Sequence, residues 1–142
     1  MPSETAPVLT IVRHFEAAPE RVFDAWLDPA RAGKFLFATP DGEMVRVEID
    51  AREGGQFRFT DRRDGTDVDH LGSYQVIDRP RRLVFTFSVP MYDPTVTRVT
   101  IEIRPDGGGC ELTLTHEGVL PDWREQTGRG WTMILQALER AL

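Results

Sequence analysis

Apolar and polar residues alternate along most of the chain, which is the pattern of half-buried β-strands. In the segment 8–15, Leu9 and Ile11 fall on one face, while Thr10 and Val12 fall on the other. Short turns rich in glycine, aspartate and proline separate the later segments, so consecutive strands are expected to be antiparallel. These later strands are predicted at residues 44–50, 56–61, 68–78, 83–87, 95–104 and 110–116.

Two short helices are predicted between the first and second strands. The first would begin at Pro19, because proline suits the first turn of a helix and an apolar stripe follows it. The second would begin at Pro29, with Asp28 as its N-cap, and would run to about Phe35. The stripe of the first helix consists of Val22, Phe23, Trp26 and Leu27.

The last part of the chain changes to a helical period. Apolar positions recur there mostly at steps of three and four residues, over about 20 residues or roughly 30 Å. Gly128 and Gly130 interrupt this pattern, and we expect them where the helix turn lies close against the sheet. The stripe consists of Trp123, Thr127, Trp131, Ile134, Leu135, Leu138 and Leu142.

The order of elements is a strand, two short helices, a run of strands and one long helix. A run of strands followed by a helix is typical of an α+β fold with the helices on one face of an antiparallel sheet. A sheet of six to seven strands, strongly curved around the last helix, is therefore expected. We predict a single domain at residues 8–142, preceded by a short disordered segment at 1–7.

Charge and cysteine content narrow the classes of function. The chain has 23 acidic and 17 basic residues, a net charge of −6, which argues against nucleic acid as a partner. Cys110 is the one cysteine, so an internal disulfide is impossible. The N-terminus does not resemble a signal peptide, and no run of about 20 apolar residues is present to span a membrane. We therefore expect a cytoplasmic protein.

Three segments carry a resemblance to a known family. They are residues 11–29, which begin Ile-Val-Arg-His-Phe-Glu; residues 72–87, which contain Gly-Ser-Tyr-Gln-Val-Ile; and residues 127–142, which begin Thr-Gly-Arg-Gly-Trp. Together they resemble the START-like or SRPBCC superfamily, in the branch of the C-terminal domain of the activator of heat-shock protein 90 ATPase. The resemblance implies the helix-grip fold, which birch-pollen-allergen-like proteins share, with a cavity between the sheet and the long helix.

One departure from the family concerns an end of that cavity. The family often carries a pair of tryptophans after the second helix, where this chain has Phe35, Leu36 and Phe37. The chain also lacks room for the additional N-terminal domain of the full-length eukaryotic co-chaperone. The resemblance therefore marks the fold strongly and implies a contact with a chaperone only faintly.

Aromatic residues form the most informative pattern for a site. Phe57 and Phe59 share one face of their strand, and Phe85 and Phe87 share one face of another. Such rings either pack as core or line a pocket for a hydrophobic ligand. His70 and Arg98 would be polar anchors if they point inward, and solvated side chains otherwise. The candidate ligand-binding residues are Trp26, Phe37, Phe57, Phe59, His70, Tyr74, Phe87, Met91, Arg98, Trp131 and Leu135.

Alternation also predicts which other side chains share a face of their strand. We expect Val45, Val47 and Ile49 on one face, and Cys110, Leu112 and Leu114 on one face of the last strand.

No metal, cofactor or catalytic group is expected. His14 and His116 stand alone on their strands, no metal-ligand spacing occurs, and no serine lies in a nucleophile motif. The leading hypothesis is a carrier of a small hydrophobic or amphipathic molecule, such as a lipid, that performs no chemistry.

Two other hypotheses belong to different classes of function. The first is an enzyme related to polyketide cyclases and aromatases, which share the helix grip. Its candidate residues are His70, Tyr74, Arg98 and Asp93. The second is an interaction module that acts with a chaperone, which would need an exposed apolar or acidic patch.

Overall fold

The computed structural model describes residues 8–36, 42–119 and 121–142. Seven strands form one antiparallel sheet in the order β1-β7-β6-β5-β4-β3-β2. Each strand after β2 pairs with the one before it, and β1 joins the sheet beside β7. The strands are β1 Val8–Phe15, β2 Glu43–Ile49, β3 Gln56–Arg63, β4 Thr66–Asp78, β5 Arg82–Val89, β6 Asp93–Asp106 and β7 Gly109–Glu117.

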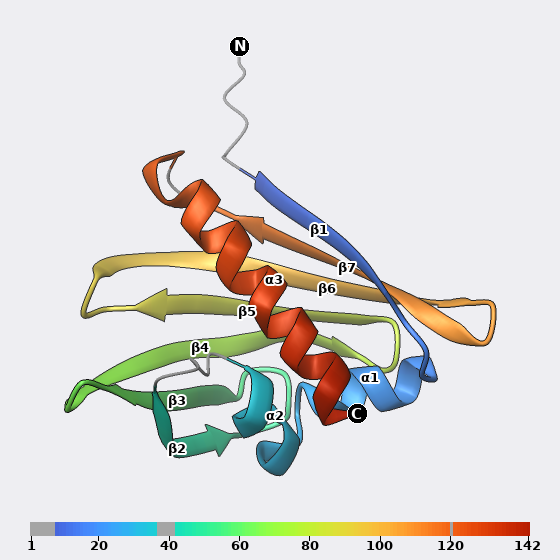
Figure 1. Cartoon of the computed structure of the whole chain (residues 1–142), viewed down its shortest axis with the longest axis horizontal. Helices are drawn as coiled ribbons and strands as arrows, with labels where there is room; N and C mark the ends of the chain where they lie inside the picture. Colours follow the sequence, from blue (N-terminus) through green and yellow to red (C-terminus); the bar gives the residue numbers. More distant parts are fainter. Residues whose placement is uncertain (1–7, 37–41, 120) are drawn as a thin grey trace.

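The helices cover one face of this sheet (Figure 1). The short helices α1 (Pro19–Ala25) and α2 (Pro29–Phe35) connect β1 to β2, as the sequence predicts. A 3-10 turn, η1 (Pro121–Trp123), leads into the long helix α3 (Arg124–Ala141), which runs diagonally across the strands. The predicted α+β helix-grip architecture is therefore confirmed.

Local chemistry explains where α2 begins. The Asp28 side chain accepts a hydrogen bond from the backbone N–H of Ala30, with 3.1 Å between Oδ1 and N, and Pro29 occupies the first helical position. An N-terminal N–H is thereby satisfied, and proline places no further N–H there that needs a partner.

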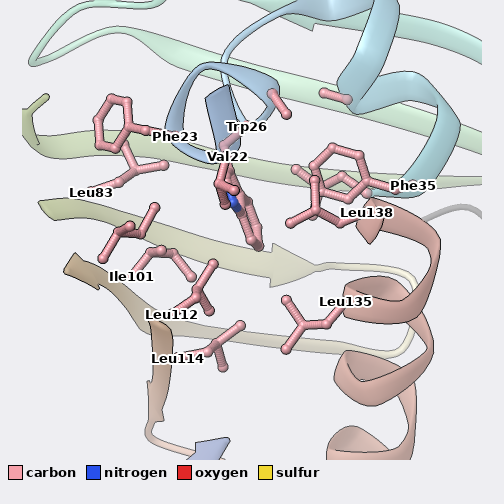
Figure 2. Close-up of a cluster of buried hydrophobic side chains, with 14 of the residues drawn as sticks. Val22, Phe23, Trp26, Phe35, Leu83, Ile101, Leu112, Leu114, Leu135 and Leu138 are labelled. Carbon is pink, nitrogen blue, oxygen red and sulfur yellow. The ribbon is translucent and has the colours of Figure 1, made fainter. Parts of the chain in front are cut away.

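The core lies where α1, α2 and the C-terminal half of α3 pack on the sheet (Figure 2). Trp26, directly after α1, is 1% exposed and packs edge-to-face on Phe35, with 5.3 Å between ring centroids. Cys110, Leu112 and Leu114 are fully buried on one face of β7, as alternation predicts. Leu135 and Leu138 close the core from α3.

One strand departs from the predicted alternation. In β2, Met44 pairs with Asp61 and Arg46 pairs with Thr60, so Val45 is an extra residue in a β-bulge. The bulge shifts the side chains by one position, and Met44 packs against the core while Val45 is exposed. The prediction that Val45 shares a face with Val47 and Ile49 is therefore wrong.

The glycines of α3 are also not explained as the sequence predicts. A Cβ added to Gly128 would lie 3.6 Å from Leu9 Cδ1, which is an ordinary van der Waals contact. A Cβ added to Gly130 would meet no atom within 4 Å. Gly130 therefore faces open space, and close packing against the sheet does not account for it.

At Gly72 in β4, by contrast, the surrounding atoms leave no room for a side chain. A Cβ there would lie 2.0 Å from the backbone oxygen of Thr86 and 2.4 Å from ring atoms of Phe57. We expect Gly72→Ala to lower the free energy of unfolding by at least about 2 kcal/mol, because both β5 and the buried ring must move. Urea unfolding followed by circular dichroism measures this loss.

Gly108→Ala is the matched control for that substitution. A Cβ at Gly108 meets nothing within 4 Å. We expect its free energy of unfolding to stay within about 0.5 kcal/mol of the parent value. Equal losses in the two variants would show that the crowding at Gly72 is not what matters.

Candidate functional site

A cavity of about 350 Å³ lies between the sheet and the N-terminal half of α3. Its volume falls within the range of small-molecule pockets, roughly 300–1,000 Å³. Strands β4 to β7 supply its floor through residues such as His70, Phe87, Thr97 and His116. The helix supplies its roof between Gln126 and Ile134, and this stretch includes Gly130 and Trp131.

Phe87 is at the centre of a group of rings on the cavity wall. The imidazole of His70 stacks on it, with 6.1 Å between centroids and 12° between planes. His116 and Trp131 approach the same ring from other sides, at centroid distances of 5.8 and 6.3 Å. These rings come from β4, β5, β7 and α3, so the wall depends on the assembled fold.

A series of hydrogen bonds joins α3 to three strands at this wall. The indole Nε1 of Trp131 donates to Nδ1 of His116 over 3.0 Å, which places the proton of the neutral imidazole on Nε2. That Nε2 then donates to Thr97 Oγ1 over 2.6 Å, and the hydroxyl donates to the Phe87 carbonyl over 3.1 Å. We refer to Trp131, His116, Thr97 and the Phe87 carbonyl as the tether.

Both buried histidines are held in the neutral form. Burial lowers the pKa of His116 from 6.5 to about 4. The pKa of His70 is also lowered to about 4, mainly by burial and further by the positive charge of Arg63. At neutral pH the imidazoles therefore add no charge to the cavity.

Arg63, at the end of β3, is the one charged side chain among the described residues that line the cavity. Its Nε donates to Asp61 Oδ2 over 2.7 Å, and its Nη2 lies 3.4 Å from His70 Nε2. The Asp61 side chain is fully buried, whereas that of Arg63 is 31% exposed. The guanidinium is thus held in place by a carboxylate that does not itself line the cavity.

The mouth of the cavity is apolar and open to solvent. Tyr92, Trp123 and Met133 line it, and they are 59%, 45% and 49% exposed. These three large apolar side chains are therefore in contact with solvent and not packed in the core.

Three of the predicted ligand-binding residues are brought together in this cavity: His70, Phe87 and Trp131. Met91 is 54% exposed and does not line it, and Arg98 is an exposed partner of Glu117, with 2.6 Å between Nε and Oε2. Phe37 lies outside the described residues. The remaining candidates lie in the buried core: Trp26, Phe57, Phe59, Tyr74 and Leu135.

The residues proposed for an enzyme do not converge. Of these, His70 lines the cavity, whereas Tyr74 is buried in the core and Arg98 is exposed. Burial raises the pKa of the Tyr74 hydroxyl well above its ordinary value, so the phenol stays protonated. The side chain of Asp93 lies outside the described set.

Arg63 and His116 are among the polar residues of the site that sequence reasoning missed. Arg63 follows Phe57 and Phe59 on the same face at even spacing, four positions beyond Phe59 and two beyond the polar Asp61. His116 follows Leu112 and Leu114 in the same way. Strict alternation was therefore a signal that could have placed both side chains on the inner face.

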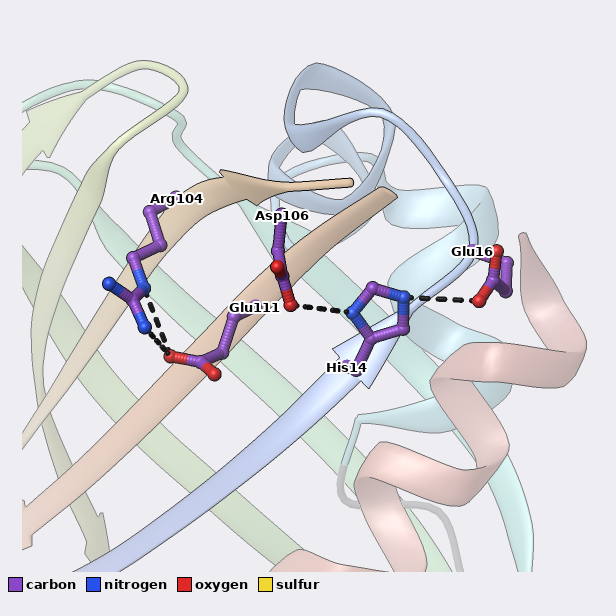
Figure 3. Close-up of polar contacts among 5 residues, drawn as sticks. All are labelled: His14, Glu16, Arg104, Asp106 and Glu111. Atoms are coloured by element: carbon purple, nitrogen blue, oxygen red, sulfur yellow. Dashed lines mark hydrogen bonds and ion pairs between the residues drawn. The ribbon is translucent and has the colours of Figure 1, made fainter. Parts of the chain in front are cut away.

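A second polar group lies elsewhere, at the end of β1 and the β6–β7 turn (Figure 3). His14 lies between two carboxylates, 3.2 Å from Asp106 Oδ2 and 3.1 Å from Glu16 Oε1. These side chains are exposed, and exposed pairs of this kind contribute about 0–1 kcal/mol. Within residues 8–36, 42–119 and 121–142, no group of three or more histidine, cysteine or acidic residues is arranged to hold a metal ion.

Comparison with protein families identifies the chain. The family model described as "Activator of Hsp90 ATPase homolog 1-like protein" matches residues 16–142. The chain belongs to this family. No curated protein matches it.

Solved structures of similar proteins share this fold. Protein CV1439 from Chromobacterium violaceum is 27% identical, with a TM-score of 0.86 and coverage of 94% of each chain. An AHSA1-like protein from Aeromonas hydrophila is 23% identical, with a TM-score of 0.82 over 95% of this chain and 91% of that one. CalU16 from Micromonospora echinospora is 26% identical, with a TM-score of 0.73 over 96% and 76%.

None of the helices in the described part of this family member is long and apolar enough to cross a membrane.

Proposed function

We propose that the protein binds a small hydrophobic or amphipathic molecule in the cavity beneath α3. The observation that carries this proposal is a cavity of about 350 Å³ whose wall is built from Phe87, Trp131 and two neutral histidines. Ligand pockets are mostly apolar with a few placed polar groups, and this wall has that composition.

The polar groups of the cavity favour binding over catalysis. The ring nitrogens of His116 are both engaged within the tether, and those of His70 face Arg63 and the Phe59 carbonyl. A general base works best with a pKa near the operating pH, whereas both histidines have pKa values of about 4. We therefore place the cyclase-like alternative second.

The binding proposal is tested by a ligand screen observed by NMR. Fatty acids, sterols and aromatic polyketides are added to the labelled protein, and the indole N–H of Trp131 reports on the cavity. A ligand is expected to shift this signal and those of Phe87 and Ile134, which also line the cavity. If no compound shifts them at millimolar concentration, the proposal fails.

Filling the cavity from the helix gives a second test. We expect Gly130→Leu to weaken binding of any compound found in the screen at least tenfold, because its side chain would extend into the open space at this position. Isothermal calorimetry measures the change in Kd.

Gly130→Ala is the matched control. It adds one carbon atom where nothing lies within 4 Å, and it replaces glycine in the interior of a helix. We expect it to raise the free energy of unfolding by up to about 1 kcal/mol and to leave the Kd within about threefold. A Gly130→Leu variant that binds as tightly as Gly130→Ala would place the ligand elsewhere.

A further inference from the structure

Among the residues that the structure describes at the cavity wall, Arg63 is the one charged side chain, and it is fixed by two contacts. The Arg63 guanidinium has Asp61 on one side and His70 on another, through the contacts of Nε and Nη2 described above. A guanidinium carries five N–H donors in a rigid fork. Those two contacts use one N–H of each nitrogen, so donors remain for an oxygen inside the cavity.

The neighbours of Arg63 decide which groups at the wall can donate a hydrogen bond to a ligand oxygen. The buried Asp61 carboxylate balances the guanidinium charge, and His70 Nε2 faces the guanidinium as an acceptor. The histidine nitrogens at this wall are committed to protein partners. Arg63 is therefore the one charged N–H donor among the described residues that line the cavity, and it favours a ligand with a hydrogen-bond acceptor.

The rest of the wall defines the body of the ligand. Phe87, His70 and Trp131 present ring faces and edges, and Tyr92 and Trp123 add rings at the mouth. Ring-lined walls favour flat ligands, which stack offset or edge-to-face at centroid distances of roughly 4.5–7 Å.

We infer that the cavity selects an aromatic ligand of one or two fused rings that carries an acceptor oxygen, as a ketone or a carboxylate, bound by Arg63. This inference rests on the proposed function and adds to it the chemical class of the ligand and the residue that recognises it.

The test compares two molecules that differ by one group. α-Tetralone and tetralin share their fused rings, and a carbonyl in the first replaces a methylene in the second. Each is titrated into the protein, and the ratio of their Kd values is measured. A tetralin carboxylate forms a third arm, which distinguishes a charged acceptor from a neutral one.

The same ratio is measured in a variant without the proposed anchor. Arg63→Met is combined with Asp61→Asn, so that no carboxylate stays buried opposite an apolar side chain. We expect the preference for α-tetralone over tetralin to fall about tenfold, because a hydrogen bond to a charged donor is lost. Tetralin should bind as before, which also shows that the variant is folded.

Arg62→Met is the matched control. Arg62 is the neighbouring residue on β3, it pairs with Asp67 through Nε at 2.8 Å, and it does not line the cavity. We expect Arg62→Met to leave the ratio of the Kd values of tetralin and α-tetralone as it is in the parent protein. Where the double variant is too unstable, Arg63→Gln, which keeps an N–H donor toward Asp61, serves for the same comparison.

The outcomes separate the two proposals. If neither compound nor the carboxylate binds the parent protein, the inferred ligand class and the anchor both fail, whereas the proposed function fails only if the NMR screen also finds no ligand. If tetralin and α-tetralone bind with the same ratio in the parent and the Arg63 variants, the cavity is a binding site but Arg63 is not its anchor. A fall in the ratio with Arg62→Met would also overturn the role of Arg63.

Discussion

Lowering the pH from 7 to 5 is expected to reduce the free energy of unfolding by about 4 kcal/mol, about 2 kcal/mol for each of His70 and His116. In the native state their pKa values are about 4. In the unfolded chain they return to about 6.5. As the pH falls through this window, the unfolded chain takes up protons that the native state does not, so protonation favours unfolding.

The measurement is urea unfolding at a series of pH values between 7 and 5. Asp and Glu side chains stay largely ionised in this range, so the slope reports mainly on the histidines. The double variant His70→Gln/His116→Gln is the control, and its stability should change far less with pH. If it keeps the full slope of the parent protein, the buried histidines are not the cause.

Trp26→Ala is expected to lower the free energy of unfolding by about 3–5 kcal/mol, the usual cost of removing a large buried ring. The indole is 1% exposed and contacts the rings of Phe35, Phe85 and Trp131 at centroid distances of 5.3, 6.5 and 6.4 Å. Chemical unfolding followed by far-UV circular dichroism measures the loss.

Trp123→Ala is the comparison for Trp26→Ala, because it also removes an indole, but from the cavity mouth instead of the core. Trp123 is 45% exposed, and we expect its removal to cost less than about 1 kcal/mol. We expect Trp123→Ala to raise the Kd of a bound ligand although it leaves the free energy of unfolding almost unchanged. Equal costs of unfolding in the two variants would contradict the division between core and mouth.

Alternation along the strands was enough to predict the architecture. The side chains of Cys110, Leu112 and Leu114 point inward as expected, and most of the predicted helical stripe lies in α3, with Trp123 in η1 and Leu142 directly after the helix. The pattern works because each strand has one face against the helices and the other toward solvent. It failed at Val45, since a bulge inserts a residue without any change in composition.

The site was less predictable than the fold. Phe85 and Phe87 lie on the same face of β5, yet Phe85 is 2% exposed in the core and Phe87 lines the cavity. Phe85 contacts the rings of Trp26, Phe57 and Tyr74, and these neighbours come together only in the assembled fold. Local sequence identifies the face of a residue, whereas packing decides whether a ring on that face meets another ring or open space.

The position of the tether divides α3 into two parts. C-terminal to Trp131, Leu135 and Leu138 are locked into the core. N-terminal to it, the helix contains Gly128 and Gly130, and glycine weakens a helix by about 1 kcal/mol per residue relative to alanine. We therefore expect this N-terminal part of α3 to open locally at a lower cost in free energy than the part that is locked into the core.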